Sequence, residues 1–124
     1  MSPAHVLVVD DRPDVLGFVC AELESAGYAV QPAENGRQAI ERQREHAADV
    51  MLVDIFMPEM DGLETIDNVR AQFPRTRIVA MSSGARGLQD YLKVARDIGA
   101  DATLHKPFAR DELLQVLQTV LGRS

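Results

Sequence analysis

The sequence predicts an α/β fold in which a parallel sheet is covered by helices on both faces. Three short apolar runs, at residues 5–9, 49–53 and 77–81, are continuous rather than alternating. Such runs are typical of strands that are buried on both faces of a parallel sheet. Amphipathic segments fill the gaps between the runs, and this alternation produces strand and helix in turn, five times.

The remaining two strands are less clearly indicated by the sequence. Residues 28–33 and 102–105 are shorter or less apolar than the three central runs. We therefore expect them nearer the edges of the sheet.

The five expected helices are recognised by apolar side chains that recur every three or four residues. In chain order these stripes are Leu16, Val19, Cys20 and Leu23; Ala39, Ile40 and Ala47; Leu63, Ile66, Val69 and Phe73; Leu92, Ala95 and Ile98; and Leu113, Leu114, Leu117, Val120 and Leu121. Pro13 opens the first helix and Gly27 closes it, while Pro74 and Gly99 close the third and the fourth. The second helix, at 36–47, has the poorest pattern.

Composition limits the classes of function. The 124 residues fit one domain, 1–124, and the formal net charge of −6 argues against direct binding of nucleic acid, which depends on Lys and Arg. No apolar run approaches the roughly 20 residues that span a bilayer, and no signal peptide pattern precedes the first strand, so we expect a cytoplasmic protein without membrane insertion. The lone Cys20 excludes an internal disulfide and fits a buried core position better than a reactive thiol.

Polar side chains stand where the predicted strands end. Asp10 and Asp11 follow the first strand, Asp54 the third, Ser82 the fourth and Lys106 the fifth. Because ligands bind at the carboxyl ends of the strands in such sheets, we expect these groups to share one edge.

This set of residues favours phosphoryl chemistry with a divalent cation. Clustered carboxylates raise one another's pKa unless a cation joins them, and Mg²⁺ prefers oxygen ligands of this kind. The set has no Cys and no converging His, so zinc is disfavoured. Asp54 can act as a carboxylate nucleophile that forms an acyl phosphate, with Lys106 and Mg²⁺ neutralising the charge and Ser82 donating a hydrogen bond.

Each of these residues also has a purely structural interpretation. Asp10 or Asp11 could cap the helix that starts near Pro13, although one cap needs only one Asp. Asp54 could be a turn residue, although residues 57–62 supply turn chemistry without it. Lys106 alone is weak support, and the general frequency of X-Pro isomers favours a trans bond after it. The joint placement at four strand ends carries the interpretation.

Four motifs in this order resemble the receiver domain of response regulators, from about His5 to the end of the chain. They are Val8-Val9-Asp10-Asp11, residues 52–62, Ala80-Met81-Ser82-Ser83 and Lys106-Pro107-Phe108. The resemblance implies a doubly wound (βα)5 flavodoxin-like three-layer sandwich, with a five-stranded parallel sheet of order 2-1-3-4-5. It also implies a signalling switch of a two-component phosphorelay rather than an enzyme, although the domain assists its own phosphorylation and dephosphorylation.

The resemblance implies a role for each site residue. Asp54 would be the phosphoacceptor, with a sensor histidine kinase or a histidine phosphotransfer protein as the donor. Asp11 and Asp54 would bind Mg²⁺ directly, together with the backbone carbonyl of Phe56, and Asp10 would act mainly through a bound water. Ser82 would be the switch hydroxyl.

The resemblance assigns the phosphate-binding role to Lys106. Phosphorylation would reshape the face made by helix four, strand five and helix five, which would bind a downstream protein that the sequence does not identify. A receiver-like interaction module that never uses phosphorylation is the alternative.

The sequence departs from the family pattern in three places. The family often has Tyr or Phe three residues before the lysine, whereas this chain has Thr103. The segment 82–99 is longer than in the stand-alone chemotaxis receiver, and Gly84 and Gly87 should make it mobile. Phe56 is large and apolar where a small polar residue is common, and we expect it to shield the acyl phosphate from water.

Two other functions fit less well. Hydrolases of the haloacid dehalogenase type have a second Asp two residues after the nucleophile, where this chain has Phe56. Flavin-binding relatives of this fold hold phosphate in a Ser/Thr-rich loop, whereas the loop at residues 10–14 is acidic and would repel it.

Overall fold

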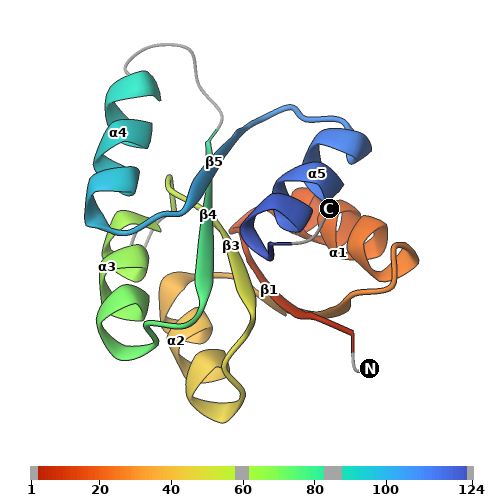
Figure 1. Ribbon diagram of the computed structural model, residues 1–124, viewed down its shortest axis with the longest axis horizontal. Coiled ribbons are helices and arrows are strands. Elements are labelled where there is room, and N and C mark those ends of the chain that lie inside the picture. Colours follow the sequence, from red (N-terminus) through yellow and green to blue (C-terminus); the bar gives the residue numbers. More distant parts are fainter. Residues whose placement is uncertain (1–2, 58–61, 83–87, 123–124) are drawn as a thin grey trace.

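The computed structural model describes residues 3–57, 62–82 and 88–122, with side chains described for all of these except 88–92. The strands are β1 (His5–Val9), β2 (Ala29–Ala33), β3 (Val50–Asp54), β4 (Arg77–Ser82) and β5 (Ala102–His105), and the helices are α1 (Pro13–Ser25), α2 (Gly36–Glu45), α3 (Gly62–Gln72), α4 (Leu88–Ile98) and α5 (Arg110–Val120). All strand pairs are parallel, and the order is β2-β1-β3-β4-β5 (Figure 1). The predicted fold class and strand order are confirmed, and β2 and β5 are the edges.

The core consists of two clusters, one on each face of the sheet. Because side chains alternate along a strand, Val6 and Val8 face one side and Leu7 and Val9 the other. The first side packs on α1 and α5, and the second packs on α2, α3 and α4 (Figure 1). The central strands are covered on both faces, as their continuous apolar runs predict.

The helix boundaries follow local signals in the sequence. Pro13 is the first residue of α1, and Gly27 and Gly99 follow α1 and α4 with φ of 96° and 132°. Positive φ is tolerated by glycine because it has no Cβ, so both residues end their helices as predicted. The second helix ends at Glu45, short of the predicted 47.

A buried polar network on α2 was not predicted. Gln43 is buried, its side-chain amide donates to the Thr76 hydroxyl over 3.0 Å, and its carbonyl oxygen accepts from the Ala48 N–H over 2.6 Å. The Thr76 hydroxyl in turn donates to the Ala48 carbonyl over 2.8 Å. The network joins α2 to the segments that precede β3 and β4.

Some expectations lie outside the described residues or are only partly met. The glycine-rich segment 84–87, the turn at 58–61 and the side chain of Leu92 are outside the described part of the chain. Cys20 is half-buried rather than fully buried, and burial raises the pKa of its thiol to about 11, with a smaller contribution from Glu24. Across the described ranges, no helix combines the length and the apolar character needed to cross a membrane.

Candidate functional site

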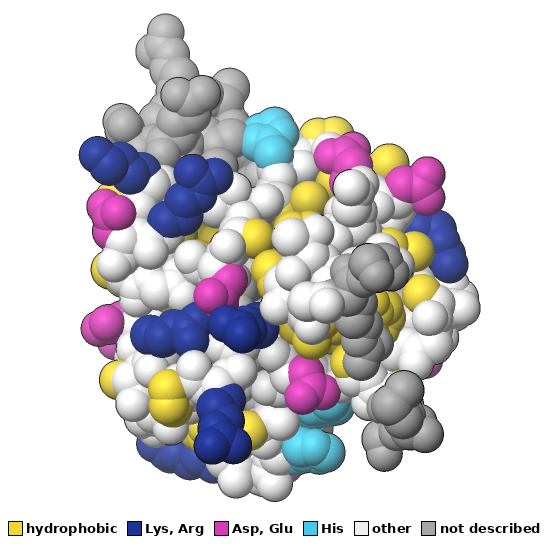
Figure 2. Space-filling view, viewed as in Figure 1, with side chains coloured by type: hydrophobic (Ala, Val, Ile, Leu, Met, Phe, Trp, Pro, Cys, Tyr) yellow, Lys and Arg dark blue, Asp and Glu magenta, His cyan; other side chains and the backbone are white. Residues whose placement is uncertain are grey.

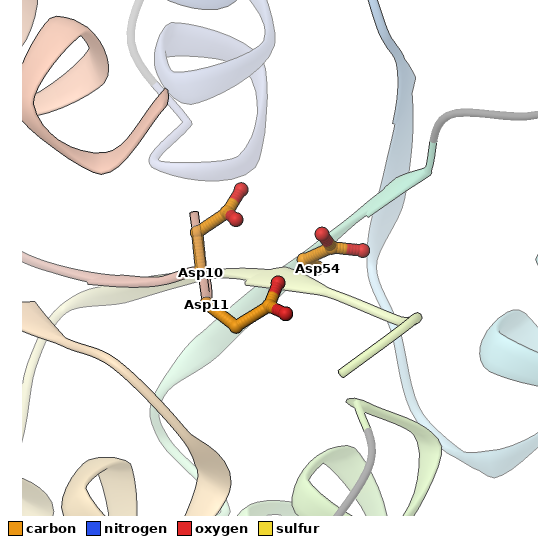
Figure 3. A group of neighbouring side chains, drawn as sticks. All are labelled: Asp10, Asp11 and Asp54. Carbon is orange, nitrogen blue, oxygen red and sulfur yellow. The ribbon is translucent and has the colours of Figure 1, made fainter. Parts of the chain in front are cut away.

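Three carboxylates surround one space at the carboxyl end of the sheet (Figure 3). Asp10 and Asp11 follow β1, and Asp54 is the last residue of the neighbouring strand β3. One oxygen from each carboxylate lies within 4.8 Å of the others. Asp10 and Asp54 are buried and Asp11 is exposed, so the cluster is open to solvent on the Asp11 side.

The Lys106 ammonium group links two of these carboxylates. It follows β5, and its Nζ donates to Asp10 Oδ2 over 2.5 Å and to Asp54 Oδ2 over 3.1 Å. Only 10% of the Lys106 side chain is exposed, so these contacts are made away from bulk water. The parallel strand order thus brings together groups that are up to 96 positions apart in the chain.

Burial of the Asp54 carboxyl raises its pKa above the ordinary value, and the charge on Asp10 adds to this effect. The Phe56 N–H, which donates to Asp54 Oδ1 over 2.9 Å, and the Lys106 ammonium act in the opposite direction. The charged form of Asp54 is therefore disfavoured on balance. A cation held between the carboxylates would relieve this cost.

The donor set fits a hard divalent cation. The three side chains offer only carboxylate oxygens, which suit Mg²⁺, and the described cluster contains no His or Cys. Asp54 and Asp10 each bind the Lys106 ammonium through one oxygen, so the ammonium already compensates part of the negative charge of the carboxylates. A site for Mg²⁺ here is consistent with both the geometry and the raised pKa of Asp54.

The structural interpretations of these carboxylates are only partly met. Arg12 is the N-cap of α1 and makes no side-chain capping bond, and the Asp10 carboxylate instead accepts from the Arg12 N–H over 3.0 Å. Asp54 does stabilise a local turn through the Phe56 N–H. That bond uses one oxygen and leaves the other for Lys106.

Ser82 ends β4 beside the cluster, because Asp54 pairs in register with the preceding residue, Met81. Its side chain is fully buried, and among the described residues its hydroxyl has no hydrogen-bond partner. An unsatisfied buried hydroxyl costs free energy, so the group is available to a ligand that could accept its hydrogen bond.

Phe56 and Thr103 mark the departures from the family pattern. The Phe56 side chain is 41% exposed just beyond β3. The Thr103 hydroxyl on β5 accepts from Arg96 Nη2 of α4 over 3.1 Å. A polar contact at the surface thus occupies the position at which the family often has an aromatic ring.

Gly62, the first residue of α3, lies directly against the end of β3 at Asp54 and Ile55. A Cβ at this position would be 2.8 Å from the Asp54 carbonyl carbon, and closer still to the Asp54 carbonyl oxygen and the Ile55 Cα. Only a residue without a side chain allows the helix to begin here. Nothing in the sequence around Gly62 indicates this contact.

An open groove of about 440 Å³ begins at Lys106 and runs between α1 and the segment after β5. It is lined by Arg12, Asp14, Val15, Phe18, Val19, Lys106, Pro107 and Phe108. Phe18 is 53% exposed, and the sequence pattern does not single it out because it lies off the apolar stripe of α1. The Lys106–Pro107 bond is cis, contrary to the general frequency of X-Pro isomers, because tertiary context, which that frequency ignores, sets the isomer.

Comparison with known proteins agrees with this arrangement. Residues 6–118 match the family described as "Response regulator receiver domain". The chemotaxis protein CheY of Bacillus subtilis is 35% identical over 121 residues, which are 96% of this chain and 99% of that protein. The response regulator MprA of Mycolicibacterium vanbaalenii is 34% identical over 122 residues, 98% of this chain but 52% of MprA. The structure of the Vibrio cholerae chemotaxis protein CheY4 has a TM-score of 0.87 and 33% identity, covering 95% of this chain and 98% of CheY4.

Proposed function

Because the chain belongs to the family of response regulator receiver domains, we propose that residues 1–124 form a switch that is phosphorylated on Asp54. Receiver domains are signalling domains rather than enzymes in their own right. The observation that carries the proposal is the buried Lys106 ammonium, which joins Asp54 to Asp10 inside a cluster of three carboxylates. This arrangement provides a nucleophile, a cation site and a positive charge for a phosphoryl group within one pocket.

The residues of the chain would share the chemistry as follows. An Asp54 carboxylate oxygen attacks the phosphorus of a phosphohistidine, the P–N bond breaks, and the imidazole leaves with the electron pair and takes up a proton. The Phe56 N–H and the Lys106 ammonium orient the carboxylate before attack. Lys106 then binds a phosphoryl oxygen, and the unpartnered Ser82 hydroxyl donates a hydrogen bond to another.

Asp11 and Asp54 would hold Mg²⁺ together with the backbone carbonyl of Phe56, and Asp10 would act through a bound water. When bound, Mg²⁺ neutralises charge on the phosphoryl oxygens. Support for this set comes from the short separation of the three carboxylates and from the exposure of Asp11, which leaves the cluster open on one side.

We propose that the donor is a sensor histidine kinase or a histidine phosphotransfer protein, which the switch meets in the cytoplasm. The groove beside Lys106 supports this proposal because it offers exposed apolar surface at Phe18 and is also lined by Lys106, the partner of Asp54. A downstream protein would bind the face made by α4, β5 and α5. The chain spans about half the length of longer relatives such as MprA, so the proposal concerns the receiver domain alone.

Incubation with acetyl phosphate and Mg²⁺, followed by intact mass spectrometry, tests the function. One added phosphoryl group is expected on the wild-type chain and none on Asp54→Asn. Asp67→Asn, an exposed carboxylate on α3, is the matched control and should behave as wild type. A wild-type chain that gains no phosphoryl group, or an Asp54→Asn variant that still gains one, would support the phosphorylation-independent interaction module instead.

A further inference from the structure

We propose that α3 transmits the structural change caused by phosphorylation of Asp54 to the end of α4 and the start of β5. Gly62 would receive the change at one end of the helix, and Arg70 would pass it on at the other. The inference rests on the proposed function, because it concerns what phosphorylation of Asp54 would move. Figure 1 shows α3 below α4 on the same face of the sheet, and the two helices are in contact.

The first end of α3 has no clearance from the phosphorylation site. The missing Cβ of Gly62 would overlap the carbonyl of Asp54 and the Cα of Ile55. Because Gly62 has no Cβ, its backbone packs directly against this segment, and close packing leaves little room for one side to move without the other. A shift of the Asp54–Ile55 backbone therefore has to displace the start of α3.

The body of α3 can transmit such a displacement as a rigid element. Thr65, Ile66 and Val69 are all fully buried along the face that packs on the sheet. A helix whose buried face is close-packed moves as one body rather than bending locally.

The second end of α3 holds α4 through the Arg70 guanidinium. Its Nε and Nη2 donate to the Gly99 carbonyl over 3.1 and 2.7 Å, and Nη1 donates to the Pro74 carbonyl over 3.0 Å. Nη2 also contacts Asp101 Oδ2 over 2.8 Å, and that oxygen accepts from the Ile78 N–H over 2.8 Å.

One side chain therefore ties together the segment after α3, the end of α4 and Asp101, which precedes β5 and in turn bonds to β4 at Ile78. The Arg70 stem also fits against Gly99, where a Cβ would be 2.9 Å from Arg70 Cγ. The two bonds to the Gly99 carbonyl are partly buried, whereas those to Pro74 and Asp101 are exposed.

The route along β5 itself is weaker in this chain. Thr103 has no ring that could pack between β5 and α4, and its bond to Arg96 is solvent-exposed. Exposed polar contacts of this kind contribute little to a conformational equilibrium. Of the two polar links to α4, the partly buried bonds of Arg70 to the Gly99 carbonyl are therefore the stronger.

The experiment uses amide NMR of the full chain with Mg²⁺ and beryllofluoride as the probe. Binding is followed at the amides of Ile55 and Phe56, and the distant response is followed at residues 95–103. Arg70→Lys keeps the charge but cannot reach two carbonyls and a carboxylate at once, because an ammonium is a compact point charge. Arg70→Gln removes the charge as well.

Figure 2 shows several Lys and Arg side chains on the α3–α4 side of this face, so a change of surface charge needs its own control. Arg77→Gln provides it, because Arg77 lies 3.9 Å from the same Asp101 carboxylate but is 56% exposed.

We expect every variant to bind the probe, with full shifts at residues 55 and 56. The shifts at residues 95–103 should fall to roughly half or less in both Arg70 variants and stay at the wild-type size in Arg77→Gln. Equal distant shifts in wild type and Arg70→Lys would overturn the inference while leaving the function intact, as would an equal loss in Arg77→Gln. A wild-type chain without shifts at residues 55 and 56 would remove the proposed function and the inference with it.

Discussion

Replacement of Gly62 by alanine should damage both the stability of the fold and the affinity of the site for Mg²⁺. The new Cβ would meet the Asp54 carbonyl group and the Ile55 Cα, which are backbone atoms that cannot rotate away. To relieve this overlap, either α3 would have to move outward or the Asp54–Phe56 segment would have to move inward. A movement of about 1 Å would bring the atoms to ordinary van der Waals contact. Both movements disturb the segment that holds the carboxylate.

The expected change in the free energy of unfolding is the balance of two opposing contributions. Overpacking of a close-packed region typically costs about 1–3 kcal/mol, whereas the helix propensity gained from glycine to alanine is at most about 1 kcal/mol and is smaller at a first helical position. The free energy of unfolding should therefore fall by about 1–2 kcal/mol, which corresponds to about 4–8 °C in Tm for a chain of this size. The affinity for Mg²⁺ should fall by about 10-fold or more, as when an outer contact of a metal ligand is lost.

Gly17→Ala is the matched control, because Gly17 is exposed within α1 and a Cβ there would meet nothing within 4 Å. This variant should gain up to about 1 kcal/mol, the opposite sign, and keep its Mg²⁺ affinity. Urea unfolding followed by circular dichroism and a Mg²⁺ titration by NMR measure the two quantities. If Gly62→Ala is as stable as wild type and binds Mg²⁺ equally well, the close approach of α3 to Asp54 has been misjudged.

Three further predictions concern single side chains. Phe56→Asn should shorten the lifetime of the phosphorylated chain, measured as the decay of the phosphorylated mass, and an unchanged rate would remove the shielding role. Asp54→Asn should unfold at a higher temperature than wild type at neutral pH without Mg²⁺. Burial raises the pKa of Asp54, so the stability that the neutral carboxyl contributes is lost as pH rises through that pKa, whereas Asn stays neutral. The gain is about 1.4 kcal/mol for each unit by which the pKa is raised, and equal Tm values would contradict it. Burial and, to a smaller extent, the charge of neighbouring His46 lower the pKa of His5, against the opposing effect of Asp49. Tm should therefore fall as pH drops below about 6.5 towards the lowered pKa, and less so in His46→Gln; a flat profile in wild type would refute this.

Much of the fold could be predicted because it depends on features visible in short stretches of sequence. The continuous apolar runs predicted the central strands to within one residue, since burial on both faces leaves no polar positions. The weaker segments proved to be the edge strands for the same reason. The gathering of Asp10, Asp54 and Lys106 also followed, because parallel order places the carboxyl ends of all the strands at one edge of the sheet, where the long Lys106 side chain reaches across to β3 and β1.

The features that escaped prediction depend on contacts between distant segments. Nothing local to Gln43 indicates that its amide is buried against Thr76, because a glutamine on a helix is usually solvated. Gly62 reads as an ordinary turn glycine until the backbone of Asp54 is placed beside it. Arg70 likewise reads as a surface charge, and only the folded chain brings the Gly99 carbonyl within its reach.

The two outer strands also bear on how the molecule behaves in concentrated solution. An unpaired strand edge is a template for association between molecules, and natural sheets limit this with proline or with very short strands. Here β2 contains Pro32, which lacks an N–H, and β5 is only four residues long. Neither border therefore offers a long, uninterrupted ladder of hydrogen-bonding groups to a second copy of the sheet.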